Sequence, residues 1–337
     1  MDVFSYKGRI MSYQTGTATG INNLLTTLFT FAAANGWTVD QAVGASDGFM
    51  RRDNVYVGFE YTSDEISIYQ ARGYTSASPL TAAGGHTNSV HTNGASRMVV
   101  NALSGAFDAY HFFESDTYIH VVIEVGEDLF RHFGFGVLSK IGSWTGGEYS
   151  YGHNWSQSVN NIFQPTSSTH KLSFDDGAHG SEGYRGFALY GTKTSGDALP
   201  GGGSTSPITK WYRATGSLIT DGDGVNAGYL VVGGWRDTAY QHFVSRGASD
   251  LNGYFPLSPI PVFITDKSAT PDVDYLMGYI PDVRLVNLKA LNTGQSYTIG
   301  SDTWVPFPVG RKGLDGVTSP VAEYTRNWGY MYKKVTA

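Results

Sequence analysis

Apolar residues recur at helical spacing near the start of the chain, at positions 21, 24, 25, 28 and 32. This i, i+3, i+4, i+7 pattern predicts an amphipathic helix over Gly20–Ala34. Thr19 is a suitable N-cap, and Asn35-Gly36 is a typical helix stop. The face opposite the apolar stripe is polar but uncharged, and it consists of Asn22, Asn23, Thr26, Thr27 and Thr30.

Two interpretations of this polar helix face are open. Neutral amides and hydroxyls cost less to bury than charged groups, so the face suits contact with another subunit. The same residues also suit a solvated face on a helix that covers a sheet.

After the helix, the hydrophobic period changes from 3.6 to 2, which predicts strands. Residues 55–61 and 66–68 alternate on either side of Ser63-Asp64, as in a β-hairpin. Residues 110–114 and 118–125 predict a second hairpin. One face of its second strand is apolar and consists of Ile119, Val121, Ile123 and Val125.

A further strand is predicted from residue 129 to residue 141. One face is marked by Leu129, Arg131, Phe133, Phe135, Val137 and Ile141. Its other face carries Gly134 and Gly136. Two glycines on one face of a strand leave room for a close neighbour or a flat aromatic ring.

These patterns predict a mainly β (α+β) fold with antiparallel sheets. Residues 1–150 form a sandwich-like body in which one helix packs on a sheet. Residues 151–255 are rich in glycine and are expected to form a β and loop elaboration that serves interaction. Residues 256–337 are expected to complete the body with further strands.

The composition excludes several classes of protein. The 337 residues include 43 glycines and no cysteine, only 15% are charged, and the net charge is −6. Without cysteine, neither a disulfide scaffold nor a thiolate metal site is possible. A sequence pI near 5.8 argues against a basic nucleic-acid binder, so no nucleic acid is expected as a partner.

The N-terminal residues predict no signal peptide, because no apolar core follows a basic start. We therefore expect synthesis in a cytoplasm. Residues 10–39 contain no charged side chain. They are amphipathic rather than uniformly apolar, so we expect no membrane span.

Three histidines lie on strands that are candidate neighbours, and adjacent strands can bring ligands to zinc. They are His111, His120 and His132, and Glu124 shares a face with His120. No pair of them has the short spacing of a helix or loop metal site. We therefore favour hydrogen-bonded histidines in an aromatic sheet, and expect neither a metal nor a cofactor.

Motifs of the common hydrolases are missing from the chain. Gly142–Gly146 places its serine one position too early for a nucleophile elbow. A glycosidase needs only two suitably spaced carboxylates, which sequence does not exclude. The conceivable partners are Glu60, Glu114, Glu124 and Glu148. Any acidic β-protein offers as many, so we expect no catalytic residues and no enzyme.

A cluster of aromatic residues that we expect to be exposed is the strongest candidate binding site. It consists of Trp144, Tyr149, Tyr151 and Trp155, which lie among Gly, Ser, Thr, His and Asn. Tyrosine and tryptophan in such company are typical of protein interfaces and of sugar-stacking platforms. An ordinary loop packed over the sheet is the alternative interpretation.

Several motifs together resemble virion proteins of tailed bacteriophages. A Thr- and Asn-rich helix followed by Asn35-Gly36-Trp37-Thr38-Val39 is similar to their opening segment. The resemblance covers both ends and the centre of the chain, but not residues 160–255. The other motifs that carry it are Val55–Phe59, Phe130–Gly136, Trp144–Tyr149, Met277–Pro281, Tyr297–Gly300 and Trp304–Pro308.

The resemblance implies a non-enzymatic structural subunit of the virion, in the tail, baseplate or neck region. Its expected partners are copies of itself and other virion proteins. Scarce charge and abundant Tyr, Asn, Thr and Gly suit a homo-oligomer whose copies contact one another repeatedly. The alternatives are a receptor- or glycan-binding β-module that contacts a cell-surface glycan, and a polysaccharide hydrolase.

Overall fold

The computed structural model describes residues 11–71, 73–74, 97–152, 187–193, 208–213, 229–232, 257–266, 273–311 and 328–336. Within these ranges the chain forms one helix and three antiparallel sheets. The predicted mainly β fold is therefore confirmed.

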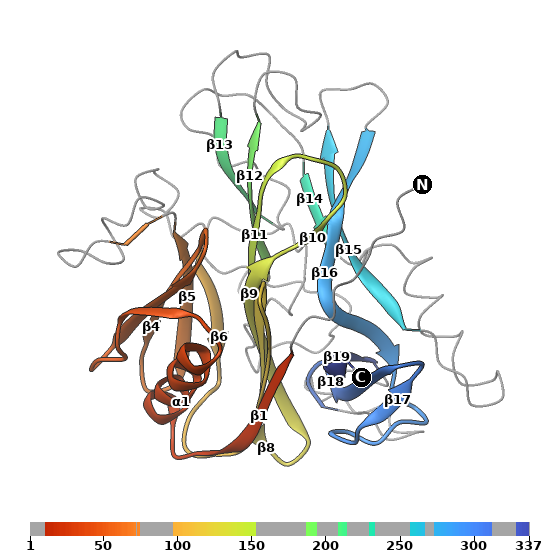
Figure 1. Ribbon diagram of the computed structural model, residues 1–337. Coiled ribbons are helices and arrows are strands. Elements are labelled where there is room, and N and C mark those ends of the chain that lie inside the picture. Colours follow the sequence, from red (N-terminus) through yellow and green to blue (C-terminus); the bar gives the residue numbers. More distant parts are fainter. Residues whose placement is uncertain are drawn as a thin grey trace.

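The central sheet runs through the middle of the molecule and has seven strands (Figure 1). Each strand pairs with its neighbours in antiparallel fashion. From one edge to the other the strands are β1 (Ser12–Ala18), β7 (Phe107–Ser115), β8 (Tyr118–Gly126), β9 (Leu129–Val137), β11 (Thr145–Gly152), β12 (Phe187–Lys193) and β13 (Ile208–Arg213).

A five-stranded sheet, here called the helix-side sheet, packs on one side of the central sheet together with helix α1 (Ile21–Ala34) (Figure 1). Its strands in order are β2 (Thr38–Gln41), β3 (Asp47–Arg52), β4 (Val55–Tyr61), β5 (Glu65–Ala71) and β6 (Arg97–Asn101). The predicted hairpin around Ser63-Asp64 is the β4–β5 pair, and it is confirmed.

The third sheet, here called the C-terminal sheet, packs on the other side of the central sheet (Figure 1). Short strand β10 (Ser139–Lys140) also pairs with its β16. In order, the strands are β14 (Tyr229–Val232), β15 (Ser258–Asp266), β16 (Val273–Asn287), β19 (Trp328–Thr336), β18 (Asp302–Pro308) and β17 (Tyr297–Ile299).

The described parts of the predicted middle region extend two sheets. Strands β12 and β13 add to one edge of the central sheet, and β14 adds to one edge of the C-terminal sheet. Most of residues 151–255 lie outside the described residues, so the predicted domain boundaries stay predictions.

Strand β8 of the central sheet is buried on both faces, and its alternate residues enter two different cores. Ile119, Val121 and Ile123 of β8 belong to the core shared with α1 and the helix-side sheet. Val125 packs against that core, so the predicted apolar face is confirmed. Tyr118 and Val122 belong to the core shared with the C-terminal sheet.

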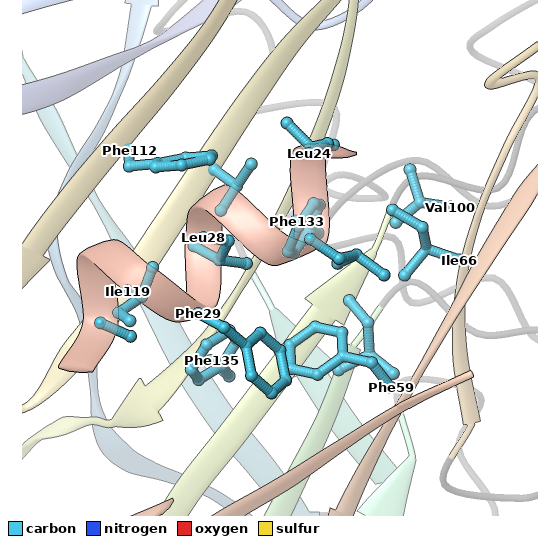
Figure 2. Packing of buried hydrophobic residues seen from close by; sticks show 14 of the residues in the cluster. Leu24, Leu28, Phe29, Phe59, Ile66, Val100, Phe112, Ile119, Phe133 and Phe135 are labelled. Atoms are coloured by element: carbon cyan, nitrogen blue, oxygen red, sulfur yellow. The ribbon is translucent and has the colours of Figure 1, made fainter. Parts of the chain in front are cut away.

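Helix α1 fills the space between the central and helix-side sheets. Figure 2 shows Leu24, Leu28 and Phe29 among aromatic and aliphatic side chains of both sheets. The helix ends at Asn35-Gly36 as predicted, because Gly36 takes a positive φ of 89° and Trp37 then donates its N–H back to the Ala32 carbonyl. The predicted N-cap is wrong, because Gly20 takes that position and has no side chain to cap with.

Strand β9 ends at Val137, so the prediction that it extends to Ile141 is wrong; Ile141 is exposed beyond the separate strand β10.

The two glycines of β9 are positions of close approach. A Cβ on Gly134 would lie 2.6 Å from the Tyr151 ring and 2.7 Å from the His120 ring. A Cβ on Gly136 would lie 2.5 Å from Cβ of Tyr118. The prediction that glycine leaves room for a close neighbour or a ring is confirmed.

Among the described residues, no helix combines the length and the apolar composition needed to cross a membrane.

Candidate functional site

The predicted aromatic platform lies in the interior of the molecule. The side chains of Tyr149 and Tyr151 are fully buried, and Trp144 is 8% exposed. The prediction that these three aromatic side chains are exposed is therefore wrong. Trp155 lies outside the described residues.

Tyr149 and Tyr151 are buried because their strand, β11, lies between β9 and β12 in the central sheet. Both tyrosines point from the central sheet into the core that it shares with the C-terminal sheet. The Trp144 indole donates to the carbonyl of Met277 at 3.2 Å, so it also faces the C-terminal sheet. The alternation Tyr149-Ser150-Tyr151-Gly152 is the signal for a strand, and the small residues around it suggested a loop instead.

His120 joins the central sheet to the C-terminal sheet. Its Nε2 lies 2.9 Å from the carbonyl of Pro281 on β16, and its Nδ1 lies 2.9 Å from the Tyr151 hydroxyl. A carbonyl only accepts, so Nε2 carries the proton and Nδ1 accepts from the tyrosine. Both ring nitrogens are therefore occupied.

His132 repeats this arrangement one strand away. Its Nε2 donates to the carbonyl of Pro308 on β18 at 2.7 Å, and its Nδ1 accepts from the hydroxyl of Tyr332 on β19 at 2.9 Å. The His132 and Tyr332 rings are nearly parallel, at an interplanar angle of 9°. Both histidines thus bridge the same pair of sheets: His120 through the Pro281 carbonyl alone, and His132 through both the Pro308 carbonyl and Tyr332.

Burial sets the charge of both histidines. It lowers the pKa of His120 and of His132 to about 3, although the hydrogen bond to a proline carbonyl opposes the shift in each case. Both rings are therefore neutral near pH 7. Burial likewise raises the pKa of Tyr151 and Tyr332 well above its ordinary value, so these hydroxyls keep their protons.

His111 on β7 is a third histidine whose ring is hydrogen-bonded to a tyrosine. Its Nδ1 lies 2.8 Å from the hydroxyl of Tyr13 on β1. Burial and, to a smaller extent, the nearby Lys334 ammonium together lower the pKa of His111 to about 4. The interpretation of these histidines as hydrogen-bonded members of an aromatic sheet is confirmed.

Tyr118 adds a polar contact beside His120. Its hydroxyl donates to the Asp282 carboxylate at 2.9 Å. Asp282 has a φ of 53°, in the left-handed region that Asp tolerates better than most residues. The pairing of β15 and β16 is irregular just beside it, between Pro259 and Pro261. This distortion presents the Pro281 carbonyl and the Asp282 carboxylate to the central sheet.

Glu114 is a buried carboxylate at the end of β7. Nη1 of Arg52 donates to its Oε1 at 2.7 Å and also to the carbonyl of Asn35 at 2.9 Å. Burial raises the pKa of Glu114 to about 7, and the Arg52 guanidinium opposes that rise. The pair ties β3 and β7 to the end of α1.

The four candidate glutamates do not form one site. Glu60 lies on the helix-side sheet, and the other three lie on the central sheet. Glu114 faces the Arg52 side of that sheet. Glu124 has the strand parity of Tyr118 and Val122, so it faces the opposite side.

A pocket of about 230 Å³ opens beside Glu60 on the helix-side sheet. Asp47 and Glu60 are directly opposite each other on β3 and β4, and like charges in that position repel. Gln41 donates to Asp47 at 2.8 Å, and the Tyr69 hydroxyl donates to Glu60 at 2.7 Å. The lining residues are Ser46, Asp47, Glu60, Tyr61, Thr62, Glu65 and Ser67.

The polar face of α1 lies on the surface. Asn22, Asn23, Thr26 and Thr30 are exposed, and Thr27 is partly exposed. The Thr27 and Thr30 hydroxyls donate to helix carbonyls four residues earlier, at 2.7 and 2.9 Å. These two hydroxyl protons are therefore occupied within the helix, and the face carries no charge. Its role as a subunit contact stays a prediction.

In the described part of the chain, no three His, Asp or Glu side chains gather in positions suited to a metal ion. No family model matches the sequence, and no curated protein matches it.

Proposed function

We propose that the chain is a non-enzymatic structural subunit of a tailed-phage virion, in the tail, baseplate or neck. It acts through contacts with copies of itself and with other virion proteins. The observation that carries this proposal is the exposed, uncharged face of α1 in a chain whose net charge is −6. Copies that carry the same net charge repel, so a neutral surface is where they approach most easily.

The hydrogen bonds made by the histidines of the central sheet support a structural role. His111, His120 and His132 are consumed in hydrogen bonds between strands or between sheets. Groups arranged in this way hold layers together and are not presented to a substrate. The motifs that resemble tailed-phage virion proteins give the proposal its location in the particle.

Size-exclusion chromatography with light scattering tests the self-contact. We expect the mass to rise with concentration from 36.5 kDa to a fixed multiple of it. High salt should not weaken this association, because the proposed surface has no charges to screen and salt also screens the repulsion between the net charges of the copies. A mass of one chain at every concentration, in both low and high salt, would contradict self-contact.

A further inference from the structure

Strand β1 forms an edge of the central sheet. It pairs with β7 on one side, from Ser12 opposite Glu114 to Ala18 opposite Phe107. Among the described residues, no strand pairs with its other side. In an antiparallel ladder, alternate residues direct their backbone N–H and C=O groups to opposite sides. About half of the backbone groups of β1 therefore point away from the sheet.

This edge lacks the features that protect other edge strands from pairing. Natural edges are short, or carry charge or proline. In this molecule β2, β14 and β17 have four, four and three residues. Strands β6 and β13 include Arg97, Lys210 and Arg213. The seven residues of β1, SYQTGTA, contain no charge and no proline.

The regular part of the edge is long enough to accept a strand. The register of β1 shifts only between Gly16 and Ala18, so Ser12–Gly16 pair without interruption. The Thr15 side chain is exposed in the middle of this stretch. The ammonium of Lys334 lies over the Tyr13 ring, 4.3 Å from its centroid, and Tyr13 packs against the core of the C-terminal sheet. The Lys334 charge therefore lies over one face of the sheet and not along the outer edge of β1.

Helix α1 runs beside β1 and extends the neutral surface. The Ser12 hydroxyl at the start of β1 donates to the Asn35 side chain at the end of α1. The end of β1 leads through Thr19-Gly20 directly into the start of α1. Strand and helix are thus antiparallel neighbours, and both fall within residues 10–39, which carry no charge.

We infer that β1 is the site at which a second copy of the chain pairs, with the two β1 strands antiparallel about a two-fold axis. A two-fold places the same strand opposite itself, so each outward donor meets an acceptor of the partner. Pairing joins two central sheets into one continuous sheet, and an uncharged helix flanks the junction on each side. The inference rests on the proposed function in taking a second copy as the partner.

Site-resolved hydrogen–deuterium exchange on the unaltered protein is the first test. Amides of β1 that bond to β7 should exchange slowly at every concentration. The outward amides of Ser12–Gly16 should exchange quickly in dilute protein and at least tenfold more slowly in concentrated protein. Outward amides whose exchange does not change with concentration would overturn the inference.

The second test compares three threonine variants by light scattering. Thr15→Lys places like charges close together at the strand pair and should weaken self-association at least tenfold. Thr15→Val removes the same hydrogen bond to the Tyr110 carbonyl without adding charge, and it should assemble like the unaltered protein. Thr298→Lys adds the same charge at an exposed position of β17 and should also assemble normally.

The outcomes separate this inference from the proposed function. Normal self-association of Thr15→Lys would overturn pairing through β1 and leave a structural role in the virion standing. If Thr15→Lys loses self-association while Thr15→Val and Thr298→Lys keep it, the β1 contact is supported. A chain that pairs through β1 but is absent from phage particles would overturn the proposed function and leave the β1 contact standing.

Discussion

His120 and His132 show how burial and hydrogen bonding fix the state of a titratable side chain. Each ring donates to a carbonyl and accepts from a tyrosine, so neither can take a second proton without losing a bond. Burial lowers both pKa values to about 3. Between that value and the ordinary pKa near 6.5, the unfolded chain binds protons that the folded chain does not.

The contribution of these two histidines to the free energy of unfolding should therefore be fully present above pH 6.5 and be lost as the pH drops toward 3. Each such histidine contributes a slope of about 1.4 kcal/mol per pH unit in this window. His132→Gln keeps an amide donor for the Pro308 carbonyl and removes the titration. Urea unfolding at pH 4, 5, 6 and 7 should show a slope smaller by about that amount. An unchanged slope would mean that His132 does not stay neutral in the folded protein.

The structural role of the histidines could be predicted from the sequence, because no metal-ligand spacing links them. The burial of Tyr149 and Tyr151 could not. Their neighbours are Gly and Ser, which are typical of loops, and the groups that interact with them electrostatically include Tyr332 and Asp282, more than a hundred residues later. Nothing local to β11 reveals that a second sheet covers it.

Strands β8, β9 and β11 illustrate packing at the scale of the element. Gly134 lies between the rings of His120 and Tyr151, which bond to each other directly across it. Any side chain on that position must push one ring away and lengthen this bond. The three strands therefore depend on glycine for their fit to the C-terminal sheet.

Gly134→Ala should lower the free energy of unfolding by about 1–3 kcal/mol, as overpacking of a core does. Gly126→Ala, at the end of β8, is the matched control, since an added Cβ there meets nothing within 4 Å. The control should differ from the unaltered protein by less than about 0.5 kcal/mol. Equal stability of the two variants, measured by thermal and urea unfolding, would contradict this packing.

Elements whose signals are local could be predicted from the sequence. Helix α1 and the β4–β5 and β7–β8 hairpins follow from hydrophobic period and turn residues. The N-cap was wrong by one residue, because Thr19 and Gly20 are both compatible with a helix start. The distortion of β16 at Pro281-Asp282 was missed, although a proline within a strand pattern is the signal for an irregular strand.

At the scale of the molecule, three sheets stack so that the central one is covered on both faces. Two polar bridges through His120 and His132 fix the C-terminal sheet to it, and the Arg52–Glu114 pair fixes the helix-side sheet. The sequence could not predict which sheet lies in the middle. The segments that connect β9, β11 and β12 have no regular hydrophobic period, so nothing in them indicates that these strands pair. The neutral surface of β1 and α1 is left outside this stack, at one edge of the central sheet.

The protein composition of purified phage particles tests the structural role most directly. Tailed-phage particles from a lysate in which this chain is produced are banded by density, washed in high salt and analysed by quantitative mass spectrometry. The proposal predicts that the chain remains with the particles in a fixed copy number relative to the other tail proteins. Absence of the chain from washed particles, or a copy number that varies between preparations, would contradict a structural subunit.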